Sequence, residues 1–132
     1  MSSASQILQE AAVSALQAHP VLATELTGIY DGPPPRATFP YIAVADGLET
    51  DWSTKTEEGR EIRLALTLWH DGDEASRLTS LKAHVEDAIA AMPRSFPGWR
   101  IASLVFLRSI VSRDPAGPWA ALVEHRVRML RQ

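Results

Sequence analysis

Residues 61–69 alternate strictly between apolar side chains and polar or small ones, and this period of two constrains the fold more than any other feature. Such alternation is typical of a β-strand with one face in a core and the other toward solvent. A strand of this kind needs both hydrogen-bonded neighbours and a cover for its apolar face. We therefore expect a sheet with helices packed on it. The apolar positions are Ile62, Leu64, Leu66 and Leu68.

The rest of the chain supplies those neighbours and that cover. Apolar residues at helical spacing predict helices over residues 4–17 and 74–92, which end at the prolines Pro20 and Pro93. Further strands are expected at 41–48, 99–112 and 119–130, the last two joined by a turn at 113–118. The order predicts an α+β fold, an antiparallel sheet of about four strands with two helices packed on one face. With 132 residues, we expect residues 1–132 to form one domain.

Composition excludes several classes of protein. The chain has no cysteine, which rules out disulfides, thiolate zinc sites and cysteine nucleophiles. The amino-terminal residues lack a basic leader and no apolar run is long enough to span a bilayer, so we expect neither secretion by a signal peptide nor a membrane protein. The formal net charge of −3 disfavours general affinity for nucleic acid.

The strand expected at 99–112 is apolar on both faces. By strict alternation, Val105 and Val111 would lie on one face and Phe106 and Ile110 on the other. Two helices cover only one face of a sheet, so the other side of this strand needs a second cover. Either a partner subunit or the proline-rich loop at 31–40 can provide it.

The polar segment at 49–60 is expected to be an exposed hairpin or flexible arm, with Trp52 as its one large apolar residue and Lys55 near its tip. An aromatic ring flanked by small polar residues is a frequent interface composition. We assign Trp52 and Lys55 to a subunit or tube interface. The alternative is that Trp52 folds back onto its own sheet.

Charge is unevenly distributed along the chain. Residues 1–93 carry a net charge of −8, whereas residues 94–132 carry seven arginines and only two acidic residues. The alternation of the last strand places Arg126 and Arg128 on one face, and Arg108 on the preceding strand is expected nearby. We assign these three arginines to an interface with the acidic part of an adjacent subunit. The alternatives are a solvated arginine face and a contact with DNA.

No arrangement of residues predicts catalysis. There is no nucleophile elbow, phosphate loop, dinucleotide glycine pattern or paired-histidine metalloprotease motif. His70, Asp71 and Asp73 form a cluster at a strand-to-helix turn, but such turns carry Asp and Gly for backbone reasons. His84 lies on a helix beside Glu86 and Asp87, where neighbouring side chains point apart. We expect no metal, no cofactor and no enzymatic activity.

Four stretches give the chain a family resemblance. They are DWSTKTEEGREIRLALTLW at 51–69, YDGPPP at 30–35, FPYI at 39–42 and the expected helix containing LQEAAVSAL at 8–16. In these stretches the chain resembles tail-completion proteins of tailed phages and gene transfer agents, in particular their tail terminators. The resemblance covers nearly the whole chain. It implies a structural protein, usually a ring of six, that caps the tail tube and contacts the tube protein and a head-side connector.

The resemblance also implies a place in the particle. The protein would be made in the bacterial cytoplasm, would sit at the head-proximal end of the tail, and would let DNA pass without binding it specifically. A second hypothesis, from a different class, is a small-ligand or peptide-binding α+β domain of a bacterial cytoplasmic protein.

Overall fold

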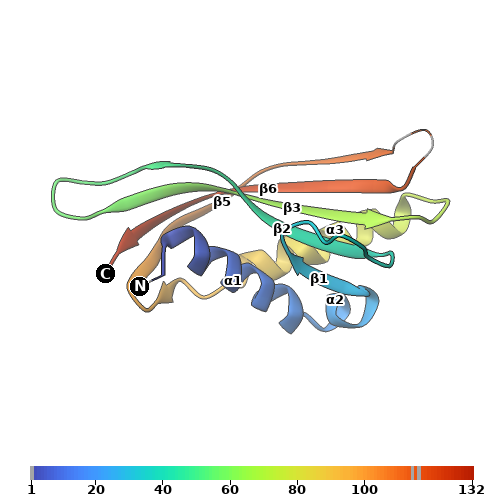
Figure 1. Ribbon diagram of the computed structural model, residues 1–132, viewed down its shortest axis with the longest axis horizontal. Coiled ribbons are helices and arrows are strands. Elements are labelled where there is room, and N and C mark those ends of the chain that lie inside the picture. Colours follow the sequence, from blue (N-terminus) through green and yellow to red (C-terminus); the bar gives the residue numbers. More distant parts are fainter. Residues whose placement is uncertain (1, 114, 116) are drawn as a thin grey trace.

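The computed structural model describes residues 2–113, 115 and 117–132. One mixed sheet runs along the molecule, with strand order β1-β2-β3-β6-β5-β4 (Figure 1). The strands are β1 (Gly28–Asp31), β2 (Tyr41–Asp51), β3 (Gly59–His70), β4 (Ser95–Phe96), β5 (Trp99–Arg113) and β6 (Trp119–Arg131). The helices are α1 (Ala4–Ala18), α2 (Pro20–Glu25) and α3 (Ser76–Ala90).

The predicted fold class, a four-stranded antiparallel sheet with two helices on one face, is wrong. Over the described residues the sheet has six strands and there are three helices, and β1 runs parallel to β2. The added strands β1 and β4 have four and two residues. Segments this short and rich in turn residues carry no alternation, and only backbone pairing with a longer neighbour defines them as strands.

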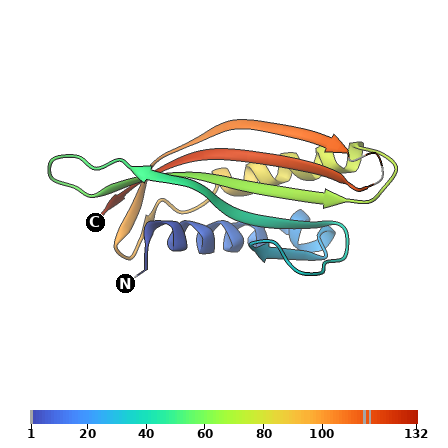
Figure 2. The ribbon, with the colours of Figure 1, turned by 45° about the horizontal axis from the view of Figure 1, so that its top comes forward.

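The core lies between the sheet and the two longer helices. The buried side chains of β3 face those of β6 in register, so that Ile62 pairs with Val127 and Leu66 with Val123. α1 and α3 lie side by side beneath the sheet and cover these residues (Figure 2). Cross-strand neighbours share a face, so we call this side the helix-facing side and the other the open face. Both termini lie at the end of the molecule from which the β2–β3 hairpin projects.

Two bulges break the alternation of β5. Register shifts between Ile101 and Ser103 and between Phe106 and Arg108 each insert one extra residue opposite β6. As a result Phe106 pairs with the buried His125 and belongs to the helix-facing side, whereas Val105 pairs with Arg126 on the open face. The assignment of faces by strict alternation therefore fails for this strand, because each bulge reverses the facing of the residues beyond it.

Two further observations concern the ends of elements. Residues 114 and 116 of the predicted turn at 113–118 lie outside the described residues, and β5 and β6 pair up to Arg113 and Trp119 on either side of it. Asp73, in the turn before the second long helix, does not cap that helix, which begins after Ala75 without a side-chain cap. None of the described helices is long and apolar enough to cross a membrane.

Candidate assembly surfaces

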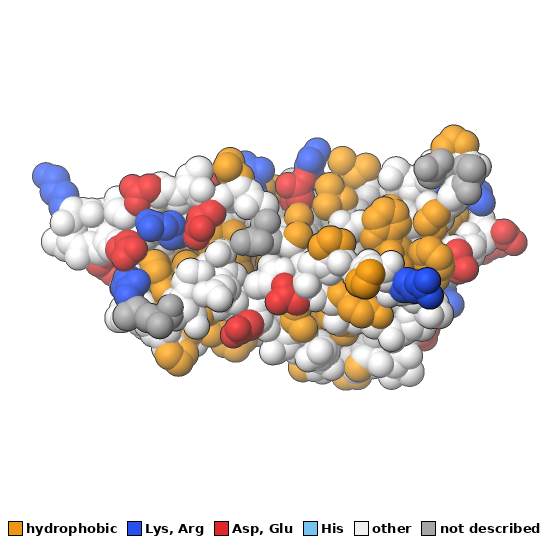
Figure 3. All heavy atoms as spheres, viewed as in Figure 1, with side chains coloured by type: hydrophobic (Ala, Val, Ile, Leu, Met, Phe, Trp, Pro, Cys, Tyr) orange, Lys and Arg blue, Asp and Glu red, His pale blue; other side chains and the backbone are white. Residues whose placement is uncertain are grey.

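Exposed apolar side chains gather on β5, on both sides of the sheet. Phe106 and Ile110 are each 46% exposed, and Val105 and Val111 are exposed as well. The loop at 32–40 connects β1 and β2 at the opposite edge of the sheet, so it does not cover them. In the space-filling view, hydrophobic side chains gather over the half of the molecule away from the hairpin tip (Figure 3). An apolar strand left open in this way is a surface suited to a protein partner.

The sheet leaves two strand edges without neighbours in the described part of the chain. β4 pairs with β5 at Trp99 and Arg100, and the Ile101 backbone N–H donates to the Arg94 carbonyl, so β5 from Ala102 onward has β6 on one side and no strand on the other. At the opposite edge, β1 pairs with β2 only over 41–44, which leaves 45–51 open on that side. Unpaired backbone donors and acceptors along an edge are a template for pairing with another chain.

The three arginines assigned from the sequence lie on the open face, but they do not form a cluster of unpaired cations. Arg108 forms a 2.6 Å ion pair with Glu124, and Arg128 forms a 2.9 Å pair with Glu61. Arg126 lies between them, directly opposite Arg63, and its buried Nε has no hydrogen-bond partner among the described residues. Glu124 shares this face by the alternation of β6 itself, whereas Glu61 was missed because cross-strand register, which the sequence does not reveal, brings it there.

The predicted arm is the outer part of the β2–β3 hairpin. β2 continues to Asp51 and β3 starts at Gly59, so only residues 52–58 form the tip. Trp52 is half-buried, and the Arg128 guanidinium lies 5.2 Å from its ring centroid. Trp52 thus contacts its own sheet, as the alternative proposed. Lys55 is exposed at the tip. The role of these two residues at an interface stays a prediction.

An apolar groove opens on the helical side. It has a volume of about 1070 Å³ and lies between α1 and the carboxyl-terminal end of α3. Its walls include Ile7, Ala11 and Ala15 of α1, Ala88 of α3, and Phe96 of β4. Sequence reasoning missed this groove, because it arises where two helices diverge and no local pattern marks that place.

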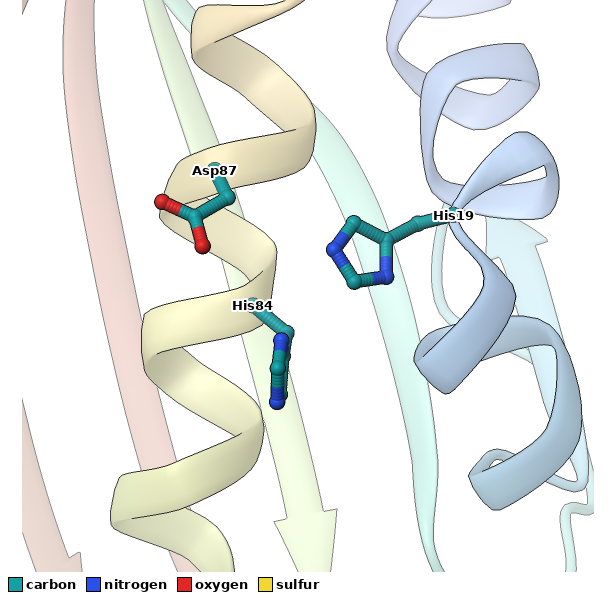
Figure 4. Close-up of side chains that lie close together, drawn as sticks. All are labelled: His19, His84 and Asp87. Atoms are coloured by element: carbon teal, nitrogen blue, oxygen red, sulfur yellow. The ribbon is translucent and has the colours of Figure 1, made fainter.

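Two histidines and an aspartate come together where α1 meets α2 and faces α3 (Figure 4). One ligand atom from each of His19, His84 and Asp87 lies within 4.8 Å of the others. The imidazole rings of the two histidines are 5.1 Å apart. Ligands of a tetrahedral zinc ion lie closer, about 3.4 Å apart given metal–ligand bonds near 2.1 Å, so the side chains would have to shift to hold a metal. His70, Asp71 and Asp73 do not form such a group among the described residues.

His125 is the buried titratable group of the sheet. It is 2% exposed, pairs with Leu64 and Phe106 across the neighbouring strands, and lies edge-on to the Phe106 ring. Its Nδ1 has no hydrogen-bond partner among the described atoms. Burial lowers the pKa of His125 from 6.5, because a charged imidazole loses its hydration there. This is a packed core histidine.

Comparisons with known proteins agree with one another. A family model described as "Tail completion protein gp17" matches residues 10–130. The tail completion protein gp17 of Bacillus phage SPP1 is 24% identical over 114 residues, which is 86% of this chain and 84% of that protein. Among solved structures, a chain in the virion of a native gene transfer agent particle superposes with a TM-score of 0.80 at 25% identity, covering 99% of this chain and all of its own. The structure of bacteriophage SPP1 gp17 gives a TM-score of 0.64 at 19% identity over 94% of this chain and 89% of its own.

Proposed function

The chain belongs to the family of the tail completion protein gp17, and from this premise we propose that it acts as a tail terminator, a ring of identical subunits on the head-proximal end of a tail tube. It is a structural protein of tail assembly in a phage or gene-transfer-agent particle. Its partners are the tube protein on one side and a head-side connector on the other.

The main observation in support of a ring is the exposed apolar surface of β5. A strand with Phe106 and Ile110 each 46% exposed, beside an open sheet edge, is unusual for a protein that works alone. Residues 1–93 carry a net charge of −8, whereas residues 94–132 carry seven arginines and two acidic residues, so one subunit can offer patches of unlike charge. Such a pair of surfaces suits contacts between unlike patches, which generate rings when the rotation closes.

The function is non-enzymatic. Titratable groups of the sheet include the ion pairs Arg108–Glu124 and Arg128–Glu61 and the buried His125, whose Nδ1 has no hydrogen-bond partner among the described residues. No described group combines a nucleophile, a base and an orienting partner within hydrogen-bond reach.

Light scattering on a sizing column tests this function. The purified protein should elute as a closed oligomer, most simply a hexamer, either alone or on addition of assembled tail tubes. Negative-stain images of capped tubes should show a ring at one end only. A protein that stays monomeric both alone and with tubes would contradict the proposal.

The groove between α1 and α3 favours a second candidate, a small-ligand or peptide-binding domain. An apolar cleft of about 1070 Å³ is in the size range of ligand sites. Ala11→Trp would fill this groove. If the protein is a terminator whose ring forms through the sheet, Ala11→Trp should leave ring formation unchanged, whereas a ligand-binding domain should lose its ligand-induced thermal shift.

A further inference from the structure

The two open edges of the sheet carry opposite charge. β5 contains Arg100, Arg108 and Arg113 and no acidic residue. β2 contains no basic residue, and its open stretch carries Glu49 and Asp51, both exposed. Two β5 edges brought together would place arginines against arginines, so like edges repel and unlike edges attract.

The open stretch of β2 and the open stretch of β5 also lie at the same level of the sheet. Following the register across, Glu49 pairs with Ile62, Ile62 with Val127, and Val127 with Leu104. Near the end of the stretch, Asp51 connects in the same way through Arg60 and Met129 to Ile101. A second copy placed beside the first in the same orientation therefore brings its residues 46–51 opposite residues 101–106.

Each of the two open edges has an exposed apolar residue, and the two residues lie at the same level of the sheet. Leu48 is 69% exposed, the highest value among the large hydrophobic residues described as exposed, and it sits in the β2 bulge opposite Arg63. Arg63 pairs with Arg126, and Arg126 pairs with Val105, which is 38% exposed at the far edge. Leu48 of one copy and Val105 of the next would meet.

Strand direction fits as well. β2 is antiparallel to β3, β3 to β6, and β6 to β5, so β2 and β5 run in opposite directions. Side-by-side copies in the same orientation thus present an antiparallel pair. Antiparallel edges can form a regular hydrogen-bonded ladder, with the bulges on both strands adding the twist that a curved, closing sheet requires.

From these four observations we propose that subunits associate head to tail, with the β5 edge of one copy paired to the β2 edge of the next. This rests on the proposed function and specifies its subunit contact: one β-sheet continues from subunit to subunit around the ring. Leu48 and Val105 form the apolar centre of each contact, Glu49 lies opposite Leu104, and Asp51 lies opposite Ile101, next to Arg100.

Cysteine crosslinking tests the contact directly, because the native chain has no cysteine. The double variant Leu48→Cys/Val105→Cys is treated with a short bismaleimide, alone and with assembled tubes, and run on a denaturing gel. We expect a ladder of covalent oligomers that ends at the closed ring. The matched control is Leu48→Cys/Ser80→Cys, since Ser80 is exposed on α3, away from both edges; it should give no ladder.

The outcomes separate this contact from the ring itself. If light scattering shows a ring but the double variant crosslinks no better than the control, the edge contact is overturned and the ring stands. If Val105→Cys alone gives dimers as efficiently as the double variant, β5 pairs with β5 and the head-to-tail arrangement is wrong. A protein that is monomeric under both conditions overturns the ring, and the edge contact with it.

Discussion

At the scale of single residues, His125 makes the stability of the subunit depend on pH. Its pKa is lowered from 6.5 by burial, so below about pH 6.5 the unfolded chain takes up a proton at this site before the folded chain does. The free energy of unfolding should therefore fall as the pH decreases from 7 to 5. Replacing His125 with Leu removes the titrating group from an apolar neighbourhood and should flatten the profile.

The measurement is urea unfolding of the native protein and His125→Leu at several pH values. His84→Gln serves as the control, because it removes a different histidine, one in a half-buried position on α3. It should keep the slope of the native protein. A His125→Leu profile as steep as the native one would show that other groups carry the acid sensitivity.

The predicted role of Trp52 in docking to the tube can be tested separately from its contribution to the stability of the subunit. Its contact with its own subunit is the Arg128 guanidinium at 5.2 Å, an interaction contributing about 0.5–1 kcal/mol at an exposed site. Trp52→Ala should therefore leave a folded monomer with a slightly lower melting temperature, while docking of the ring to tubes weakens. Co-sedimentation with tubes measures docking. Trp52→Phe, which keeps a ring under Arg128, is the control, and global unfolding by Trp52→Ala would place Trp52 in the core instead.

At the scale of elements, the periodic spacing of apolar residues predicted the strands and helices whose side chains pack in the core. The strand at 61–69, the last strand and both long helices were predicted because each buries a regular apolar stripe, such as Leu64 to Leu68. β1, β4 and residues 49–51 of β2 were not predicted as strands, because they are held by backbone pairing and their side chains carry no pattern. The bulges in β5 were missed for the same reason. The family resemblance, based on 30–42 and 51–69, is confirmed by the match to residues 10–130.

The first helix depends on its amino-terminal cap. The Ser3 hydroxyl accepts a hydrogen bond from the Gln6 backbone N–H, and the Gln6 side chain accepts one from the Ser3 backbone N–H. α1 carries Leu8 and Leu16 into the core, so fraying of its first turn weakens that packing. Ser3→Ala should lower the free energy of unfolding by about 0.5–2 kcal/mol. Ser14→Ala, at an exposed position within the same helix, should be neutral or slightly stabilising; equal losses in both variants would exclude a capping effect.

Arg126 tests the open face of β6 without breaking an ion pair. It lies opposite Arg63, so Arg126→Glu replaces a like-charge pair with an opposite-charge pair, which contributes roughly 0.2–1 kcal/mol in favour of the monomer. Arg128→Glu would instead face Glu61 and is less informative. We expect Arg126→Glu to keep the monomer folded and weaken subunit association in sedimentation velocity. Unchanged association would identify these arginines as a solvated face.

At the scale of the whole molecule, the two edges of the sheet differ from each other. Its acidic β2 edge and its arginine-bearing β5 edge lie on opposite sides of the sheet, and the two long helices lie against one of its faces (Figure 2). A subunit with two unlike edges can extend indefinitely or close, and closure depends on the rotation between copies. The twist of the sheet and its bulges set that rotation, which links the irregularities of β2 and β5 to the size of the ring.

Salt should weaken the association of subunits. The charges near the proposed contact are the exposed Glu49 and Asp51 and the half-buried Arg100. Their attraction decreases as the Debye length falls from about 10 Å at 0.1 M salt to about 3 Å at 1 M. Sedimentation velocity should show a shift from oligomer toward monomer over this range of sodium chloride. Glu49→Arg should associate more weakly at low salt and lose part of the salt dependence, whereas Glu10→Arg, on the exposed side of α1, should behave as the native protein. If high salt leaves the native oligomer unchanged, the apolar pair Leu48 and Val105 holds the contact without help from charge.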